Sequence, residues 1–193
     1  MKCDCLIVGV GGQGVLSVAA IIARSAAKLG FSVRQSEVHG MAQRGGAVSA
    51  HLRLAGFGET IAGDMVPKGE ADLIIAMEPL ESLRYLSWLS PDGMVVSSAD
   101  SLINIPNYPE KAEIEKAIKS LPKSLLINAE ALAREAGMVR TVNIVLVGAA
   151  SPFLPIPAQM LESTITEIFI AKDPRLAELN KTAFNLGRSA QQA

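Results

Sequence analysis

The feature that most limits how this chain can fold is a glycine-rich turn between a strand pattern and a helix pattern. Residues 3–8 form a short, continuous apolar run, and Gly9-Val10-Gly11-Gly12-Gln13-Gly14 follows it directly. Helix-forming residues continue to Leu29, Gly30 is a natural stop, and residues 31–36 form a second strand pattern. Strand, glycine loop, helix and strand within roughly 35 residues predict a βαβ unit, which implies a parallel strand pair with a right-handed crossover.

The patterns of strands and helices continue to alternate along the chain. We expect further strands at residues 47–54, 71–77, 94–98 and 124–128, and helices that begin near Pro79, Glu113, Ala129, Pro157 and Asp173. Residues 141–150 are apolar enough to pack inside. This order predicts a single three-layer α/β domain over residues 1–193, with a mostly parallel, Rossmann-like sheet, some antiparallel edge strands and a helical C-terminus.

Three local expectations concern the strand at residues 47–54 and the turns after it. Apolar residues alternate there with polar or small ones, which predicts a half-exposed strand with His51 at the surface or at an interface. Residues 59–62 are expected to return as a short hairpin partner. Pro91-Asp92-Gly93 is expected to form a turn before the strand at 94–98.

Composition excludes several classes of partner. The net charge is −1, and no cluster of lysine and arginine gives the footprint of a nucleic-acid-binding protein. No apolar stretch is both long enough and sufficiently free of glycine and proline to span a bilayer, and the N-terminus lacks a signal-peptide pattern. We therefore expect a cytoplasmic protein that binds neither nucleic acid nor membrane.

The two cysteines are predicted to be free, buried thiols. Cys3 and Cys5 are two apart on one strand, so alternation places them on the same face, where a disulfide would be strained. Two cysteines are also too few to hold an iron–sulfur cluster within this chain. Any such cluster would have to belong to a partner.

The glycine loop has the spelling G-x-G-x-x-G in the strand-to-helix context of a phosphate-binding turn. Such glycines allow close backbone approach, and the helix N-terminus offers free N–H groups to an anion. The candidate ligand-binding residues are Gly9, Gly11, Gly12, Gln13 and Gly14, with Glu37 as a possible ribose partner after the second strand. The alternative is that a tightly packed strand–helix turn needs glycine whether or not a ligand binds.

A second glycine-rich segment follows, with the sequence Glu37-Val38-His39-Gly40-Met41-Ala42-Gln43-Arg44-Gly45-Gly46. Arg44 offers a planar five-donor group suited to a carboxylate or phosphate, and His39 can bind or titrate near neutral pH. The candidate residues here are Glu37, His39, Gly40, Gln43, Arg44, Gly45 and Gly46. They either contact a ligand or hold the loop together and dock it on a partner chain.

These two motifs together resemble the gamma domain of the 2-oxoacid:ferredoxin oxidoreductases, and Glu78-Pro79-Leu80-Glu81 and Asn143 are also similar to that family. The His-Gly-Met-x-Gln-Arg-Gly-Gly form is most similar to the small subunits of its indolepyruvate branch. The resemblance implies a subunit that is inactive alone and supports oxidative decarboxylation of an aryl 2-oxoacid to an aryl-acetyl-CoA. It further implies that thiamine diphosphate, Mg and the iron–sulfur clusters lie in a large catalytic (alpha) subunit that passes electrons to ferredoxin, with CoA as cosubstrate.

Two other functions remain open at the level of the sequence. The glycine loop also suits a free-standing Rossmann-type enzyme or nucleotide-binding module, which would bind NAD(P), FAD or a nucleotide. A third possibility is a scaffold whose glycine loops only pack. None of the three assigns a catalytic residue or a metal ligand to this chain.

Overall fold

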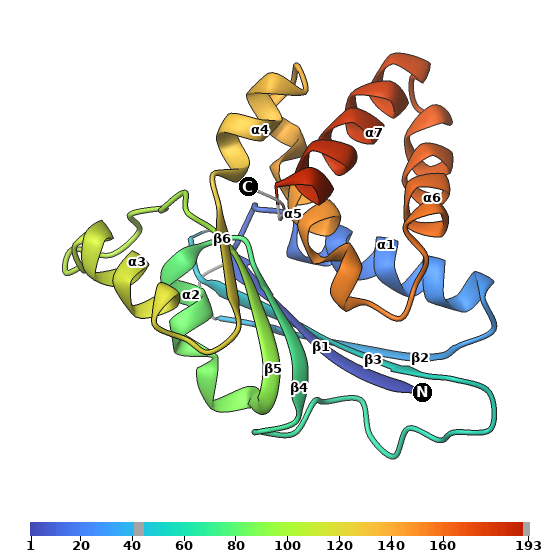
Figure 1. Cartoon of the computed structure of the whole chain (residues 1–193), viewed down its shortest axis with the longest axis horizontal. Helices are drawn as coiled ribbons and strands as arrows, with labels where there is room; N and C mark the ends of the chain where they lie inside the picture. Colours follow the sequence, from blue (N-terminus) through green and yellow to red (C-terminus); the bar gives the residue numbers. More distant parts are fainter. Residues whose placement is uncertain (41–44, 191–193) are drawn as a thin grey trace.

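The fold is built on one six-stranded sheet, seen in the computed structural model, which describes residues 1–40 and 45–190. The strand order is β2-β3-β1-β4-β5-β6 (Figure 1). Strands β1, β4, β5 and β6 are mutually parallel, whereas β3 is antiparallel to both β1 and β2. The strands span β1 Lys2–Val10, β2 Ser32–His39, β3 Ala47–Ala55, β4 Ala71–Ala76, β5 Leu89–Ser98 and β6 Ser124–Ile127. The predicted fold class is confirmed, including the antiparallel strands at one edge.

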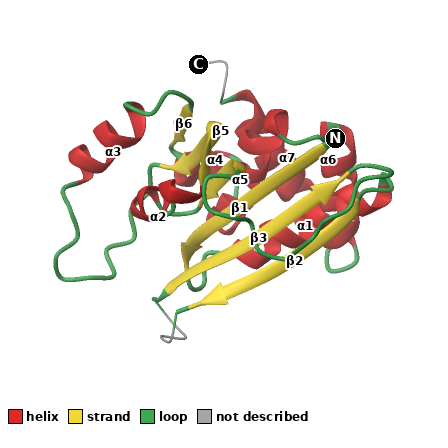
Figure 2. Cartoon of the chain, turned by 90° about the horizontal axis from the view of Figure 1, so that it is seen from below, coloured by secondary structure: helices red, strands yellow, loops and turns green. Residues whose placement is uncertain are grey.

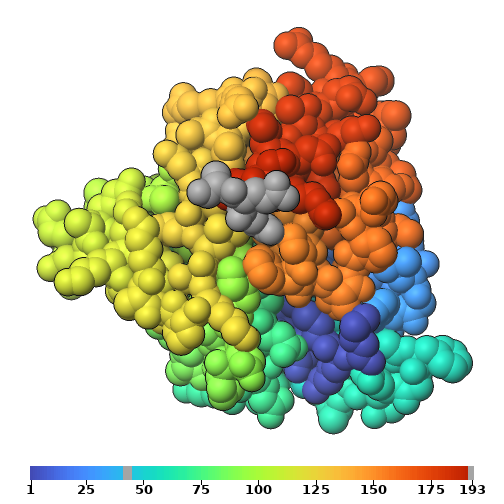
Figure 3. Space-filling view, viewed as in Figure 1, coloured from blue at the N-terminus to red at the C-terminus, as the bar shows by residue number. Residues whose placement is uncertain are grey.

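Helices cover the sheet in two layers. One face carries α1 (Val15–Lys28) and the helices of the C-terminal half, and the other carries the shorter α2 and α3 (Figure 1). The C-terminal helices, orange to red in Figure 3, pack directly against the N-terminal part of the chain. The remaining helices are α2 Pro79–Arg84, α3 Lys111–Lys119, α4 Ala129–Glu135, α5 Val142–Ala150, α6 Ala158–Ile170 and α7 Pro174–Ser189, with short 3₁₀ turns at Leu86–Trp88, Val139–Thr141 and Ser151–Phe153.

The core between the sheet and the larger helical layer is aliphatic and tightly packed. The prediction that residues 141–150 pack inside is confirmed, because the side chains of α5 from Ile144 onward are buried. Helices α5 and α7 cross at two glycines. A Cβ added at Gly148 would lie 2.0 Å from the Phe184 carbonyl oxygen, and one at Gly187 would lie 1.9 Å from that of Val145. Only glycine permits this backbone approach.

The two cysteines are free and buried, as predicted. Their sulfur atoms lie 3.5 Å apart on the helix-covered face of β1. The hydrogen bond with Cys3, and then burial, raise the pKa of the Cys5 thiol, so Cys5 is a poor source of thiolate. Both residues serve the core.

The expected βαβ pair is wrong in one respect. Strands β1 and β2 run in the same direction, but they are not neighbours, because β3 inserts between them and pairs with both. Strands β2 and β3 pair antiparallel along their length, from Ser32 opposite Ala55 to His39 opposite Val48. A crossover helix fixes the direction of the strand that follows it but leaves a gap that a later strand can fill.

Three local expectations are also wrong. Every residue of β3 after Ala47 is buried, and His51 is only 1% exposed. Residues 59–62 form no strand. They belong to segment 56–70, which crosses the sheet face opposite α1 and contacts β3 there (Figure 2). Pro91-Asp92-Gly93 lies inside β5, where the register with β4 jumps from Leu89 to Met94. A chain segment without regular structure covers the polar face of β3, and hydropathy alternation gives no sign of such a cover.

Candidate functional site

The candidate site lies at the edge of the sheet where the parallel strands end. Ligands of open α/β sheets bind at this carboxyl edge, because the loops after the strands converge there. The loop after β1 is the glycine loop, and the loops after β4 and β5 begin at Met77 and Ala99. The end of β2 and the start of β3 reach the same edge, because Val10 pairs with Ala47 and His39 pairs with Val48.

The glycine loop makes a close-packed turn that its own glutamine holds in place. A Cβ at Gly9 would lie 2.8 Å from that of Met77, while Gly12 and Gly14 have φ values of 101° and 87°. The Gln13 Oε1 accepts a hydrogen bond from the Val10 N–H at 2.7 Å, and its Nε2 donates to the Met77 carbonyl at 3.5 Å. Gln13 is therefore a structural residue of the loop.

Helix α1 starts directly from this loop and presents its N-terminus at the edge. Gly14 is its N-cap, with no side-chain capping bond and no acidic residue in the first turn, among the residues that the structure describes. A Cβ at Gly14 would lie 2.8 Å from the Asn143 Nδ2, so the amide of Asn143 is beside the turn. Backbone N–H groups at a helix start, with positive partial charge, suit a bound anion.

A cavity of about 570 Å³ opens beside the loop, with walls from five parts of the chain. Arg140 has no carboxylate partner among the described residues, whereas Asp100 accepts hydrogen bonds from the Ser98 hydroxyl and the Glu130 N–H, each at 2.7 Å. The Ser101 Oγ is buried with no hydrogen-bond partner in the described part of the chain. The lining residues are Gly12, Gln13, Gly14, Met77, Asp100, Ser101, Leu102, Glu130, Val139, Arg140, Val142 and Asn143.

A second cavity, of about 540 Å³, lies on the other side of the glycine loop and reaches His39 and Gly40. The two cavities share Gly12 and Gly14. The Gly11 N–H donates to the Gly46 carbonyl at 2.9 Å, and the Asn104 amide donates to the Gly45 carbonyl at 2.8 Å. The two glycine-rich motifs of the sequence are therefore joined by a direct hydrogen bond, and Asn104 holds the second motif from residues 99–109.

The structure places most of the sequence-predicted residues together. Gly9, Gly11, Gly12, Gln13 and Gly14 form one turn, and Gly40, Gly45 and Gly46 lie beside it. Glu37 is exposed, and its carboxylate is 3.3 Å from the His39 Nε2 and 3.2 Å from the Gln35 amide. Gln43 and Arg44 lie outside the described residues.

A buried carboxylate cluster lies behind the cavity; the sequence pointed to Glu78 and Glu81 only through the family resemblance and gave them no role. Glu78 is 1% exposed and accepts hydrogen bonds from the Glu81 N–H at 2.9 Å, the Leu102 N–H at 3.4 Å and the Tyr108 hydroxyl. Burial, and then the bond to Glu78, raise the pKa of Tyr108 to about 12. Burial also raises the pKa of Glu81. Glu78 thus ties the cavity wall at residues 99–109 to the end of β4.

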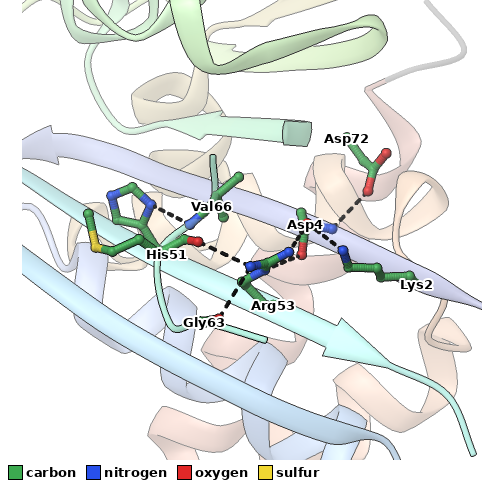
Figure 4. Close-up of polar contacts among 8 residues, drawn as sticks. Lys2, Asp4, His51, Arg53, Gly63, Val66 and Asp72 are labelled. Atoms are coloured by element: carbon green, nitrogen blue, oxygen red, sulfur yellow. Dashed lines mark hydrogen bonds and ion pairs between the residues drawn. The ribbon is translucent and has the colours of Figure 1, made fainter. Parts of the chain in front are cut away.

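The outer face of the sheet carries a separate polar network (Figure 4). Arg53 makes two hydrogen bonds of 2.9 Å to Asp4 and donates to the carbonyls of Gly63 and Met65. His51 accepts the Val66 N–H at its Nδ1, and burial lowers its pKa. The network fastens segment 56–70 to the sheet and lies away from the glycine loop.

The fold and the site define a Rossmann-like α/β protein with cavities on both sides of the glycine loop. The sequence profile of the family described as "Pyruvate ferredoxin/flavodoxin oxidoreductase" matches residues 4–190. The chain belongs to this family, as a subunit of a 2-oxoacid:ferredoxin oxidoreductase.

Relatives agree in sequence and fold. The chain is 39% identical to the indolepyruvate oxidoreductase subunit IorB of Pyrococcus horikoshii, with 96% of this chain and 94% of that protein covered. It is 38% identical, with the same coverage, to that subunit of Thermococcus kodakarensis. The pyruvate oxidoreductase subunit PORC of Thermotoga maritima has the same fold (TM-score 0.72, 18% identity, 97% of this chain and 96% of that chain).

A larger protein contains the same fold as one part. The 2-oxoglutarate:ferredoxin oxidoreductase of Magnetococcus marinus, solved with 2-oxoglutarate, coenzyme A and succinyl-CoA bound, matches at TM-score 0.77 and 20% identity. The match covers 99% of this chain but 31% of that one. The chain thus spans less than a third of the length of that protein.

Two searches of the described residues give negative results. No group of three or more His, Cys, Asp or Glu side chains in residues 1–40 and 45–190 is arranged to hold a metal ion. None of the helices within those ranges is long and apolar enough to cross a membrane.

Proposed function

We propose that this chain is the small subunit of an indolepyruvate (aryl 2-oxoacid):ferredoxin oxidoreductase and that it works only together with a large alpha subunit. In this proposal the large subunit carries thiamine diphosphate, Mg and the iron–sulfur clusters and delivers electrons to ferredoxin. Support comes from the family membership and from the near-full-length similarity to relatives named indolepyruvate oxidoreductase subunits.

The carboxyl edge of the sheet is proposed to form the CoA side of the shared active site. CoA carries phosphate groups, and the glycine loop offers backbone N–H groups at the start of α1 without an opposing carboxylate in its first turn. Arg140, which has no carboxylate partner within residues 1–40 and 45–190, adds a positive charge to the cavity, and Ser101 lines its wall. This cavity is the single observation that carries the assignment of CoA.

The role proposed for these residues is binding and orientation. Arg140, Ser101, Asn143 and the loop N–H groups would hold the anionic end of CoA, while the chemistry of decarboxylation belongs to the large subunit. The segment from Glu37 to Gly46, with His39, Gln43 and Arg44, is proposed to meet the large subunit. An Arg44→Ala variant that kept both assembly and turnover would leave that segment without a chemical role.

The test uses the complex reconstituted from both subunits. Arg140→Ala removes one charge-assisted contact, so we expect the KM for CoA to rise about 10-fold or more, while the KM for the 2-oxoacid stays within about twofold. Arg175→Ala is the matched control, because Arg175 also has no carboxylate partner among the described residues and lines neither cavity. Equal KM values for CoA in the two variants would contradict the assignment of CoA to this cavity.

The requirement for a partner is tested on the isolated subunits. We expect oxidation of aryl pyruvates only after mixing, so full activity of this chain alone would contradict the proposal. The competing function, a free-standing nucleotide-binding module, is favoured by the G-x-G-x-x-G turn alone. It predicts that NAD(P) or FAD, and not CoA, raises the melting temperature of the purified chain.

A further inference from the structure

A second groove lies behind Arg140, on the side away from the glycine loop. It runs between α1, the start of α5, the end of α6 and the start of α7, and its volume is about 420 Å³. Arg140 and Asn143 line both this groove and the glycine-loop cavity. We call it the helix groove, and define it by its charged rim, Arg24, Arg140 and Lys172, and its apolar floor, Ile21, Phe169 and Leu176.

The charge of the helix groove is unbalanced. Most lysines and arginines of the protein have a carboxylate within 4.0 Å, as Lys28 has Glu167 and Lys181 has Glu162. Arg24, Arg140 and Lys172 have no such partner within the described ranges, and no aspartate or glutamate lines the groove. Three uncompensated cations around one concavity, in a protein of net charge −1, favour an anionic occupant.

The floor of the groove is apolar. Ile21 is 2% exposed, and the Phe169 ring is partly exposed, with the Lys172 Nζ 5.7 Å from its centroid. Asn180, 2% exposed, also lines the groove, and its amide Nδ2 donates to the Leu176 carbonyl. An inorganic anion would leave this floor uncovered, whereas a ring-sized or short aliphatic body would cover it.

We propose that the helix groove binds a small organic acid, with its carboxylate among Arg24, Arg140 and Lys172 and its apolar body on Ile21, Phe169 and Leu176. The size agrees with this class, because ligand pockets begin at about 300 Å³. The lining of the groove has no carboxylate that could accept hydrogen bonds from the hydroxyls of a ribose, and this distinguishes the groove from a nucleotide site. Two sources share the chemistry: aryl acids of the kind that the proposed reaction consumes, and aliphatic acids unrelated to it.

Occupancy of the helix groove has a consequence for the neighbouring cavity. Both sites use Arg140, so an acid in the groove competes for the guanidinium that the other cavity offers to its anion. The coupling is negative and reciprocal. This consequence, unlike the binding itself, rests on the proposed function.

Binding is tested on the purified full chain by calorimetric titration. The probes are phenylacetate and hexanoate, with phenylacetamide as the uncharged analogue and acetate as the carboxylate without an apolar body. We expect phenylacetate or hexanoate to bind at least 10-fold more tightly than phenylacetamide and acetate. Tighter binding of phenylacetate identifies aryl acids as the source, and tighter binding of hexanoate identifies aliphatic acids.

Variants locate the bound acid. The double variant Arg24→Gln/Lys172→Gln is expected to weaken acid binding at least 10-fold, and Phe169→Ala is expected to weaken it as well. Lys116→Gln is the matched control, because Lys116 on α3 also has no carboxylate partner in the part of the chain described here and lies outside the groove. Absence of binding, equal binding of the charged and uncharged probes, or an equal loss in the control overturns the proposal.

A second arm uses the complex with the large subunit. Phenylacetate is expected to raise the KM for CoA of the wild type but not of Arg24→Gln/Lys172→Gln, whose KM without added acid matches the wild type. An acid that binds the isolated chain but not the complex shows that the large subunit covers the groove, which overturns its assignment to a small molecule. Failure of the CoA proposal is seen separately, in the Arg140→Ala kinetics.

Discussion

Replacing Glu78 by alanine tests whether one buried carboxylate holds the wall of the candidate site. Glu78 caps α2 through the Glu81 N–H and accepts hydrogen bonds from two groups of segment 99–109, the Leu102 N–H and the Tyr108 hydroxyl. That segment carries Asp100 and Ser101 to the cavity. Without Glu78 the donors lose their acceptor, and the wall loses its link to the end of β4.

The magnitude follows from the individual contacts. Loss of a helix N-cap costs about 1 kcal/mol. Loss of a hydrogen bond to a charged group costs roughly 1.5–3 kcal/mol, and the Tyr108 contact belongs to this class. The long contact to Leu102, at 3.4 Å, adds little. We therefore expect Glu78→Ala to destabilise the domain by about 3 kcal/mol, which corresponds to a fall in Tm of roughly 6–12 °C.

The assay is thermal and urea unfolding of Glu78→Ala beside a matched control. Glu110 is also the N-cap of a helix, α3, but its exposed side chain makes no capping bond with the described residues, so Glu110→Ala should change stability by less than about 0.5 kcal/mol. Tyr108→Phe removes only one of the Glu78 contacts, and the double variant should show coupling of about 1 kcal/mol or more. Equal stability of Glu78→Ala and Glu110→Ala would refute the reasoning.

Three further predictions concern the scaffold. In Arg53→Met, the buried Asp4 (3% exposed) keeps only Lys2 as a charged partner, so urea unfolding should show a loss of stability of about 3–5 kcal/mol. The double variant Asp4→Leu/Arg53→Met should recover most of that stability. A double variant no more stable than Arg53→Met would contradict this. The pKa of His51 is lowered in the folded chain, so the unfolded chain binds the proton more readily. Stability should then be full above pH of about 6.5 and fall toward pH 5. His51→Gln should lose this slope, while His39→Gln keeps it. Gly187→Ala puts a Cβ 1.9 Å from the Val145 carbonyl oxygen, so melting curves should show a loss of stability of about 3 kcal/mol or more. The control Ala190→Gly, just after α7, should lower the stability by less than about 1 kcal/mol.

The parts of the fold that could be predicted from the sequence are those set by local chemistry. The apolar run at residues 3–8, the glycine turn and the stop at Gly30 specify one strand, one loop and one helix without reference to distant residues. The same holds for the helix starts at Pro79 and Pro174, where a proline follows a capping carboxylate from Glu78 or Asp173. In these cases propensity and tertiary structure agree.

The neighbours of each strand could not be predicted in the same way. The crossover after β1 gives the direction of β2, but the position of β3 between them depends on pairing with both partners at once. The error about His51 has a related cause. Polar residues on alternate positions of β3 predict solvent, yet the polar groups of His51 and Arg53 are matched by backbone groups of segment 56–70 and by Asp4. A polar face that is covered and hydrogen-bonded has the same sequence pattern as an exposed one.

The candidate site also contains residues that could be predicted from the sequence and residues that could not. Its glycines were visible because positive φ angles and close approach leave a residue-type signature, as at Gly12 and Gly14. The groups that give the cavity its chemical character, Ser101 and Arg140, have ordinary residue types in irregular or short segments, and only the convergence of loops at the sheet edge brings them to the glycine turn. The glycine motif therefore predicts where an anion can approach the backbone. Under the proposed function, the preference for one anion over another depends on Arg140 and Ser101, whose positions only the complete fold determines. Substitutions at these two residues are therefore expected to change ligand preference, whereas Gly14→Ala should weaken the binding of every ligand of the loop alike.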